Sequence, residues 1–407
     1  MKILFAMNEF VPSVGGAMGV AGDEIASLAK LGHEIVIVSG TAGDSWQGIP
    51  MRTIPVKDAK WAFKSYVGLR NPRVERAFEA ILIEEKPDVV HFHNLYFQYP
   101  FSLIKIARTH CRKVFFTAHD AMSMSPNKLF HFVSSKAGPV DPNDYHLSLY
   151  EEWRQNKKAF NPFRRFFIRQ YLRSATRIFA VSYELKKAMN ANGIHNIEVL
   201  HNALDPQKYS YDKTTALALR DKLGLKDKKV ILVAGRLSVL KGGIAAIEIL
   251  NEVKRSVPEA VLLALTDKEN SDVMKGRAKE LGIADSIVSV QSVPRDQIQN
   301  YYGLSDVVMM PSLCLDTFGM VPLEAMACSK PVVVTTFGGA REMVEEGKNG
   351  YVANPLRAAE FAAPIIGILS NSNKAEAMGK RSREIVEERF TLKEHVSKLL
   401  SLYMTVS

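Results

Sequence analysis

Short apolar runs alternate with longer amphipathic stretches along the whole chain. Runs of about 4–8 apolar residues bounded by turn signals suit buried strands of a parallel sheet, and the stretches between them suit helices. In the first half the runs are 2–7, 34–39, 88–93, 113–118 and 177–182. In the second half they are 229–234, 260–265, 287–290, 307–310 and 331–334. Because both halves alternate in this way, the pattern predicts an α/β protein made of two Rossmann-like domains with parallel sheets.

The length of 407 residues suits two domains of ordinary size. A polar, lysine-rich segment after residue 205 is expected to link them. We therefore predict a first domain over 1–205 and a second domain over 206–385. The remaining segment, 386–407, contains an amphipathic helix.

The segment 311–327, with the sequence PSLCLDTFGMVPLEAMA, carries the clearest candidate chemistry. It follows a predicted strand, and Pro322 fits the first turn of a helix, where a missing N–H group costs nothing. The N–H groups of Gly319, Met320 and Val321 would then lie at the positive end of the helix dipole. Such a helix start is a binding site for an anion, most naturally a phosphate.

Charged side chains accompany this helix start. Asp316 precedes it and Glu324 follows on the first turn, so a sugar attached to the phosphate would find acceptors for its hydroxyls. Taken alone, this pattern fits a plain buried corner between a strand and a helix equally well. In the segment 229–242, KVILVAGRLSVLKG, Arg236 leaves the end of a predicted strand and Lys241 opens the next helix. Ligands of open α/β sheets bind at that end of the strands, and the two cations match two phosphates.

Together these two segments resemble the signature of the retaining nucleotide-sugar glycosyltransferases of the GT-B fold, in particular family GT4. That family shows G-R-L followed by K-G, and then E-x-F-G-x-x-x-x-E, where this chain has Asp316 in place of the first glutamate. The resemblance covers nearly the whole chain. It implies two facing Rossmann-like domains, a deep cleft between them, and a C-terminal helix that crosses back to the first domain. It also implies that the first domain binds the acceptor and the second binds the donor.

The resemblance further implies roles for single residues of the second domain. Arg236 and Lys241 would neutralise the donor diphosphate, and the backbone amides after Phe318 would complete its cradle. Glu324 would hold the ribose hydroxyls, and Asp316 the hexose hydroxyls. The implied donor-binding set is Gly15, Gly16, Arg236, Lys241, Asp316, Phe318, Gly319, Met320, Val321 and Glu324.

The first domain offers further candidates. Gly15 and Gly16 lie too far behind the first strand for a nicotinamide-binding loop, and the resemblance places them beside the donor diphosphate. His119 lies in a T-x-H-D pattern, and the resemblance places it next to the reacting sugar. The implied catalytic set is His119, Arg236, Lys241 and Asp316. His91 and His93 share one face of a strand, but a metal site needs a third ligand and none is suggested. We interpret His91 as nearer the core and His93 as a polar group facing the cleft. The candidate acceptor-binding residues are His93, Asn94 and Asp120.

Cysteine usage and hydropathy point to the cytoplasm. The three cysteines, Cys111, Cys314 and Cys328, have the spacing of neither a disulfide framework nor a metal site. The chain begins directly on a strand, without the pattern of a signal peptide. No segment approaches the roughly 18 apolar residues of a membrane span. We expect a cytoplasmic protein, with attachment to the inner face of the membrane as one alternative.

The net charge of +10 is concentrated in the first half. Residues 1–200 contain 26 Lys and Arg against 18 Asp and Glu, whereas 201–407 contain 27 against 25. The segment 153–183 has no acidic residue, and the basic residues between 154 and 177 are interleaved with aromatic ones. A segment of this kind can lie on an anionic membrane surface, where each Lys or Arg contributes about 1 kcal/mol. A core helix with a solvated basic face fits equally well, and no motif for binding nucleic acid is present.

The resemblance implies transfer of a hexose from a nucleotide-diphosphate sugar to an acceptor hydroxyl with retention of anomeric configuration. The acceptor would be a saccharide or a lipid-linked molecule of polysaccharide, lipopolysaccharide or glycolipid synthesis. No D-x-D triplet is present, so neither a metal nor another cofactor is expected. Departures from the family pattern at 265–268 and at Ser292 leave the donor base open. The alternatives are a GT-B epimerase or phosphorylase, or a sugar-nucleotide-binding protein without catalysis.

Overall fold

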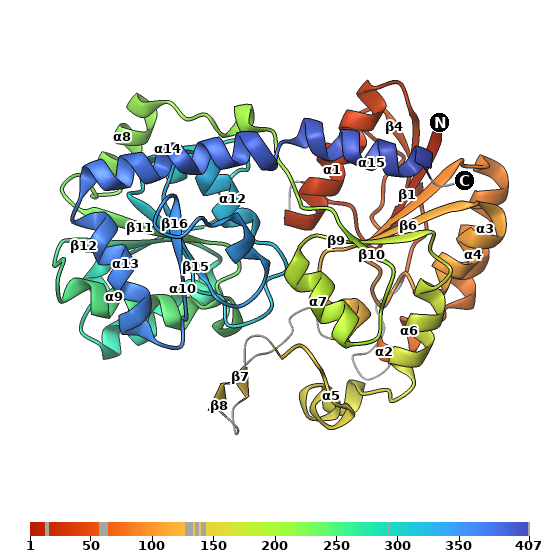
Figure 1. The fold of residues 1–407 in the computed structure, drawn as a ribbon, viewed down its shortest axis with the longest axis horizontal. Coiled ribbons are helices and arrows are strands. Elements are labelled where there is room, and N and C mark those ends of the chain that lie inside the picture. The colour runs from red at the N-terminus through yellow and green to blue at the C-terminus, as the bar shows by residue number, and fades with distance from the viewer. Residues whose placement is uncertain are drawn as a thin grey trace. The chain divides into compact units, whose positions relative to one another are not determined.

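The computed structural model describes residues 1–12, 16–56, 64–126, 133–134, 138–139, 144–291 and 293–405. The chain divides into two compact units. Unit 1 takes its described residues from 1–130, 143–203 and 392–407, and unit 2 takes them from 131–142 and 204–391. Each unit contains a parallel sheet with helices on both faces (Figure 1).

The sheet of unit 1 has the strand order β10-β9-β6-β5-β1-β2-β4-β3. Its strands are β1 (Lys2–Met7), β2 (Glu34–Ser39), β3 (Ser45–Trp46), β4 (Ile49–Thr53), β5 (Val89–His93), β6 (Lys113–Ala118), β9 (Arg177–Ala180) and β10 (Ile197–Val199). All neighbouring pairs are parallel except β3 with β4. The chain builds outward from β1 on one side and from β5 on the other. The boundary between β1 and β5 is therefore the switch point of this sheet, where α/β proteins place their ligands.

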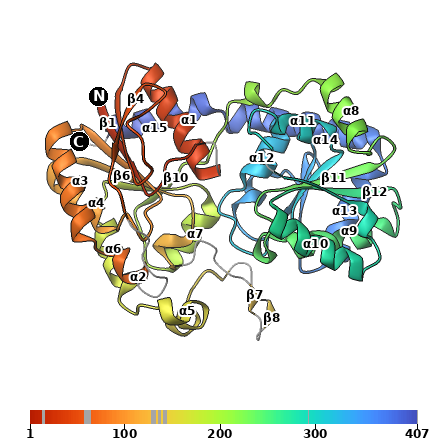
Figure 2. The same cartoon turned by 180° about the vertical axis from the view of Figure 1, so that it is seen from behind.

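Helices cover both faces of this sheet. They are α1 (Gly16–Lys30), α2 (Lys64–Val67), α3 (Pro72–Glu85), α4 (Ser102–His110), α5 (Leu149–Asn156), α6 (Arg164–Leu172), α7 (Tyr183–Ala191) and α15 (Leu392–Thr405). Helices α1 and α15 share one core with β1, β5 and β6, built around Phe5, Phe115, Leu399 and Tyr403. The same two helices lie together in both views (Figures 1 and 2). The C-terminal helix thus packs on unit 1, as predicted.

The sheet of unit 2 is entirely parallel, in the order β13-β12-β11-β14-β15-β16. Its strands are β11 (Lys229–Ala234), β12 (Ala260–Leu265), β13 (Ile287–Val290), β14 (Val307–Met310), β15 (Val332–Thr335) and β16 (Gly350–Ala353). Its helices are α8 (Lys213–Lys222), α9 (Gly243–Lys254), α10 (Lys268–Glu280), α11 (Ile298–Leu304), α12 (Met320–Ala327), α13 (Ala358–Leu369) and α14 (Ser372–Arg389). Helices α9, α10 and α13 lie on one face, and α11, α12 and α14 on the other (Figures 1 and 2). The switch point lies between β11 and β14.

Every strand predicted from the hydrophobic pattern is present, and the predicted α/β class with two Rossmann-like units is confirmed. The pattern missed β3, β4, β10 and β16, which are short or contain Pro and Gly, and which lie at or next to sheet edges. It also missed the two-residue strands β7 (Val133–Ser134) and β8 (Gly138–Pro139), which pair with each other in a separate antiparallel sheet. The chain first leaves unit 1 after Ala203, close to the predicted boundary at 205. The predicted boundary at 385 falls inside α14, and the chain returns to unit 1 at Leu392. Within the described residues, no helix combines the length and hydropathy that crossing a membrane requires.

Candidate active site

Two loops meet at the switch point of unit 2, one after β11 and one after β14. The short 3-10 helix Val239–Lys241 ends at Gly242, whose φ is +83°. A Cβ atom there would lie 2.0 Å from the carbonyl oxygen of Pro311, so only glycine allows the two backbones to approach this closely. The K-G pair of the sequence therefore holds Lys241 against the loop that follows β14.

Lys241 binds an acidic residue of that loop. Its Nζ lies 2.7 Å from Oδ2 of Asp316, and the Ser312 hydroxyl lies 3.2 Å from the same oxygen. The backbone N–H of Gly339 donates to the carbonyl of Asp316 at 2.8 Å, which fixes the loop against the next strand–helix connection. Burial lowers the pKa of Lys241, but the Asp316 carboxylate outweighs burial, and the pKa lies above its ordinary value. The ammonium group is thus charged, and only one of its three N–H donors is used by Asp316.

Helix α12 begins directly behind this ion pair. Gly319 is its N-cap, with a φ of +90° that favours glycine, and Pro322 occupies the first turn. The first N–H groups of a helix have no acceptor within it. The described residues record no acceptor for the N–H groups of Met320 and Val321. Phe318 is buried and packs against Phe390, with ring centroids 5.8 Å apart, so its side chain supports the loop from behind. These two N–H groups are the donors that the predicted anion cradle would use.

Glu324 lies on the first turns of α12 between two phenols. Tyr302 donates to one carboxylate oxygen at 2.7 Å, and Tyr209 donates to the other at 3.2 Å. Burial raises the pKa of the Glu324 carboxyl, although Tyr302 opposes this. Each carboxylate oxygen can accept two hydrogen bonds, so capacity remains for further hydroxyl donors. Sequence reasoning missed both tyrosines, because neither is near Glu324 in the chain.

Arg236 follows Gly235 at the end of β11 and is exposed. In the described part of the chain, no hydrogen bond or ion pair of its guanidinium group is recorded. Its charge lowers the pKa of Lys241 slightly, against the larger effect of Asp316. An anion of two charges would neutralise both.

In unit 1, the end of β5 holds a buried chain of ionisable side chains. His93 Nδ1 lies 3.0 Å from Nε2 of His119, which follows β6. His93 Nε2 lies 3.3 Å from Oε2 of Glu24 on α1, and the other Glu24 oxygen lies 2.8 Å from His395 Nε2 on α15. Burial is the main cause that lowers the pKa of His119, and the electrostatic effect of His93 is the second; the pKa lies at about 3. Burial raises the pKa of the Glu24 carboxyl, but the two histidines outweigh it and hold the pKa well below its usual range.

A second group of polar residues surrounds His119. The backbone N–H of His119 donates to Oδ1 of Asn94 at 3.0 Å. The Asn94 amide donates to the Tyr96 hydroxyl at 2.9 Å, and that hydroxyl donates to Asp120 at 2.7 Å. The structure thus brings together the predicted residues Asn94, Asp120 and His119, and it adds Tyr96, which the sequence did not single out.

Comparisons with known proteins identify the family of the chain. Residues 14–208 match the family described as "Glycosyltransferase Family 4", and residues 217–385 match "Glycosyl transferases group 1". The two matches together span both units. The chain belongs to the family 4, group 1 glycosyltransferases.

Individual relatives of this glycosyltransferase are distant. It is 27% identical to a "GDP-mannose-dependent alpha-(1-6)-phosphatidylinositol monomannoside mannosyltransferase" of Mycolicibacterium smegmatis over 51% of this chain and 56% of the relative. The chain therefore spans about half the length of that relative. An "Uncharacterized glycosyltransferase MJ1607" of Methanocaldococcus jannaschii is 24% identical over 99% of this chain and 98% of its own. The crystal structure of Anabaena Alr3699/HepE in complex with UDP superposes with a TM-score of 0.74 and 20% identity, and covers 99% of each chain. That likeness confirms the GT-B fold.

One candidate residue differs from its prediction, and another lies outside the described residues. His93 has no exposed surface, so it does not face a cleft as predicted; it contacts His119 and Glu24 instead. Gly15 lies outside the described residues, whereas Gly16 is exposed at the first position of α1. His91 is buried in the core, as predicted.

Glu24 supplies the third polar partner that the sequence did not suggest beside His91 and His93. The ligand atoms of these three residues lie within 4.8 Å of one another. However, both nitrogens of His91 already have partners, since Nδ1 contacts the Tyr403 hydroxyl and Nε2 lies 2.7 Å from the Thr117 hydroxyl. The arrangement therefore fits a hydrogen-bonded network better than a metal centre, where each ligand must offer a free lone pair.

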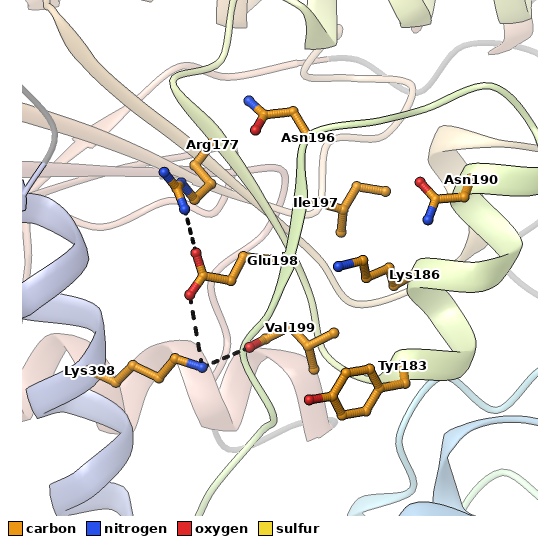
Figure 3. Close-up of a pocket in the computed structure, with 9 residues that line it drawn as sticks. All are labelled: Arg177, Tyr183, Lys186, Asn190, Asn196, Ile197, Glu198, Val199 and Lys398. Carbon is orange, nitrogen blue, oxygen red and sulfur yellow. Dashed lines mark hydrogen bonds and ion pairs between the residues drawn. The ribbon is translucent and has the colours of Figure 1, made fainter.

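A pocket of about 530 Å³ lies elsewhere on unit 1, beside β10, α7 and α15 (Figure 3). Its lining residues are Arg177, Tyr183, Lys186, Asn190, Asn196, Ile197, Glu198, Val199 and Lys398. Glu198 lies between two of the cations, 2.6 Å from Arg177 and 4.0 Å from Lys398 (Figure 3). No predicted site residue lines this pocket, and Glu198 balances only part of the positive charge of Arg177, Lys186 and Lys398.

Proposed function

We propose that this glycosyltransferase moves a hexose from a nucleotide-diphosphate sugar to an acceptor hydroxyl with retention of anomeric configuration and without a metal. The main support for a nucleotide-sugar donor is the arrangement of charged and N–H groups at the switch point of unit 2. The charged Lys241 and the exposed Arg236 lie on the loop after β11, and the N–H groups at the start of α12 follow the loop after β14. The GDP-mannose-dependent relative and the UDP complex of a protein with the same fold support a nucleotide-sugar donor.

In the proposed reaction, the diphosphate leaves as the glycosidic bond breaks. Negative charge then develops on the leaving phosphate oxygens, and fixed positive charges that stabilise it lower the barrier. Lys241, Arg236 and the amides of Met320 and Val321 supply that stabilisation. Asp316 accepts hydroxyls of the hexose while it orients Lys241, and Glu324 accepts hydroxyls of the ribose. His119 contributes from unit 1, beside the reacting sugar.

Nucleotide binding is tested first, because the proposed catalysis requires a bound donor. We expect one of UDP, GDP or ADP, or a hexose conjugate, to stabilise the protein in a thermal-shift assay. At about 100 times the dissociation constant the gain is roughly 2.7 kcal/mol. Arg236→Ala and Glu324→Ala should remove the shift. Arg255→Ala is the matched control, since Arg255 directly follows α9 in the same unit and its side chain is 69% exposed. No shift with any nucleotide would refute the proposal.

Retention and independence from metal need their own measurements. Once donor and acceptor are found, the anomeric configuration of the glycoside product, read by NMR and compared with that of the donor, reports retention or inversion. Activity should survive exhaustive treatment with EDTA. An inverted product or loss of activity with the chelator would refute the corresponding part of the proposal.

We further propose that unit 1 receives a lipid-linked acceptor at an anionic membrane surface. Exposed apolar side chains of α5 and α6 and of the residue before α6 form what we name the aromatic patch: Leu149, Tyr150, Trp153, Phe163, Phe166 and Phe167. The ion pair of Arg165 with Glu152, at 2.7 Å, joins the two helices. The neighbouring Lys157, Lys158 and Arg173 are exposed and available to anionic lipid. By contrast, Arg164 is buried and donates to the Met122 carbonyl, so only part of the basic segment can face a membrane.

Co-sedimentation with vesicles tests the aromatic patch. We expect binding to vesicles that contain anionic phosphatidylglycerol, weaker binding at high salt, and little binding to pure phosphatidylcholine. The double variant Trp153→Ser, Phe163→Ser should lose binding. Lys268→Ser with Lys275→Ser, which removes two exposed cations of unit 2, should not. Binding of neither vesicle, or equal loss in both variants, would refute the proposal.

A further inference from the structure

The pocket of Figure 3 lies along one edge of the sheet in unit 1, and we name it the edge pocket. Its lining includes β10, the last strand at that edge, and side chains of α7 and α15. Its volume of about 530 Å³ lies within the range of pockets that bind small molecules. None of the candidate donor, catalytic or acceptor residues lines it. A ligand in the edge pocket would therefore be additional to those of the proposed reaction.

The backbone of β10 offers hydrogen-bond donors to the edge pocket. The N–H of Leu200 donates to β9, and the carbonyl of Asn196 accepts from β9. Alternate residues of a parallel strand direct their backbone groups at the partner strand, so the N–H groups of Ile197 and Val199 point away from β9. In the sheet of the described residues no strand lies on that side of β10. No acceptor for these two N–H groups is recorded among the same residues.

The carbonyl groups of the same two residues also face this edge. Lys398 of α15 donates to the carbonyl of Val199 at 3.0 Å, so that acceptor is already used. The carbonyl of Ile197 is the second acceptor. Ile197 and Val199 are only 8% and 7% exposed, so a group that binds their backbone is sheltered from water. The edge thus offers two N–H donors and one carbonyl acceptor.

The charged side chains of the edge pocket favour an anion. Glu198 lies 2.6 Å from Arg177 and 4.0 Å from Lys398, so two cations share its single negative charge. The third cation is Lys186 of α7, which extends toward β10 (Figure 3). In the described part of the chain no hydrogen bond or ion pair of its ammonium group is recorded. Because three cations accompany one carboxylate, the lining has a formal charge of two positive units.

We infer that the edge pocket binds a small soluble phosphomonoester that also carries hydroxyl groups. A phosphomonoester has a charge of about −1.5 to −2 at pH 7, which matches two positive charges better than the single charge of a carboxylate. The N–H groups of Ile197 and Val199 and the ammonium group of Lys186 would donate to the phosphate oxygens. The pocket is larger than a phosphate group alone. The amides of Asn190 and Asn196 also line it, and amides both donate to hydroxyls and accept from them.

Hydrogen exchange can locate the ligand, which matters because unit 2 also has a candidate phosphate site. The probes are glucose 6-phosphate and inorganic phosphate, and the controls are glucose and glucuronate, which lack the phosphate. We expect glucose 6-phosphate to slow amide exchange in peptides of α7 and β10, inorganic phosphate to do so at higher concentration, and glucose to have no effect. Equal protection by glucuronate would refute the choice of a phosphomonoester. Unchanged exchange in α7 and β10 with every probe would refute the binding site.

A matched pair of variants tests the role of Lys186. Lys186→Gln should weaken the binding of glucose 6-phosphate about 10-fold or more, because it removes a charged donor. Lys187→Gln is the control, since Lys187 is the next residue of α7, is 62% exposed, pairs with Glu184 and does not line the pocket. Equal affinity of the wild type and Lys186→Gln would overturn the inference. Loss of binding in Arg236→Ala, with full binding in Lys186→Gln, would place the phosphate in unit 2 and overturn it as well.

A lipid head group is another source of a phosphomonoester. Co-sedimentation with vesicles that contain phosphatidic acid separates this source from a soluble ligand. We expect Lys186→Gln and Lys187→Gln to bind these vesicles equally well, and weaker binding of Lys186→Gln alone would refute the soluble ligand in favour of a lipid. None of these measurements requires transferase activity. The edge pocket and the proposed function can therefore be refuted separately.

Discussion

The ion pair between Lys241 and Asp316 gives a quantitative prediction at the donor site. Its atoms lie 2.7 Å apart, and the side chains are 24% and 18% exposed. Removing one partner of a fully buried pair costs about 3–5 kcal/mol, and an exposed pair contributes about 0–1 kcal/mol. With about one fifth of each side chain in water, Asp316→Asn should destabilise unit 2 by about 2 kcal/mol. It leaves the Lys241 ammonium without its anion.

A double-mutant cycle isolates the interaction. Lys241→Met should also destabilise the protein, and the double variant should be less destabilised than the two single effects added, with a coupling energy of about 1–2 kcal/mol. All three tryptophans, Trp46, Trp61 and Trp153, lie in the first half of the sequence. Unfolding of unit 2 in urea is therefore better followed by amide hydrogen exchange in β11 and β14 than by tryptophan fluorescence.

An exposed pair in the same unit provides the control for this cycle. Arg255 and Glu252 lie 2.7 Å apart at the end of α9, and the Arg255 side chain is 69% exposed. Their coupling should stay below about 0.5 kcal/mol. If the Lys241–Asp316 cycle is additive within the same limit, the two charges do not stabilise each other. The assignment of Asp316 as the residue that orients Lys241 would then be refuted.

Three further substitutions test other parts of the structure. Gly242→Ala should displace the loop from Pro311, and the positive φ alone should cost at least about 1–2 kcal/mol of stability. Nucleotide binding should also weaken in the same thermal-shift assay. Unchanged stability would contradict the close approach of the two backbones. Tyr302→Phe should cost about 1–3 kcal/mol in urea unfolding, because it leaves the buried Glu324 carboxylate with one donor fewer. His119 binds a proton in the unfolded chain below pH 6.5 but in the native protein only near pH 3. It should therefore make stability rise with pH in that window by about 1.4 kcal/mol per unit, and His119→Gln should flatten the measured slope.

The parts of the site that the sequence could predict are local in the chain. Arg236 and Lys241 lie on one short loop after a strand, and Asp316 and Glu324 lie on another. The ability of such a loop to bind an anion depends on the order of its own residues and on the dipole of the helix that follows it. The switch-point geometry of parallel sheets then brings the two loops together. The strand pattern of the sequence is therefore enough to predict that the two loops are neighbours.

The partners of the site residues could not be predicted, because tertiary packing supplies them. Tyr209 donates to Glu324 across 115 positions of the chain, and His395 reaches Glu24 across 371. No periodicity links residues at such separations. Glu24 also lies on the buried face of an ordinary amphipathic helix, where a single carboxylate gives no signal in the sequence. The prediction that His93 faces a cleft was wrong for the same reason, because its contacts are Glu24 of α1 and His119 after β6.

The C-terminal helix is consequently part of the chemistry of unit 1 as well as part of its core. Val396 and Leu399 of α15 pack on the apolar face formed by β1 and β6, as an amphipathic pattern predicts. The same helix directs His395 at Glu24 and Tyr403 at His91, so both histidines of β5 depend on it, one through Glu24 and the other directly. Without α15 the buried Glu24 carboxylate would lose its hydrogen bond to His395. The return of the chain to unit 1 therefore supplies hydrogen-bond partners to buried polar groups of α1 and β5, the strand whose His93 contacts the candidate catalytic His119.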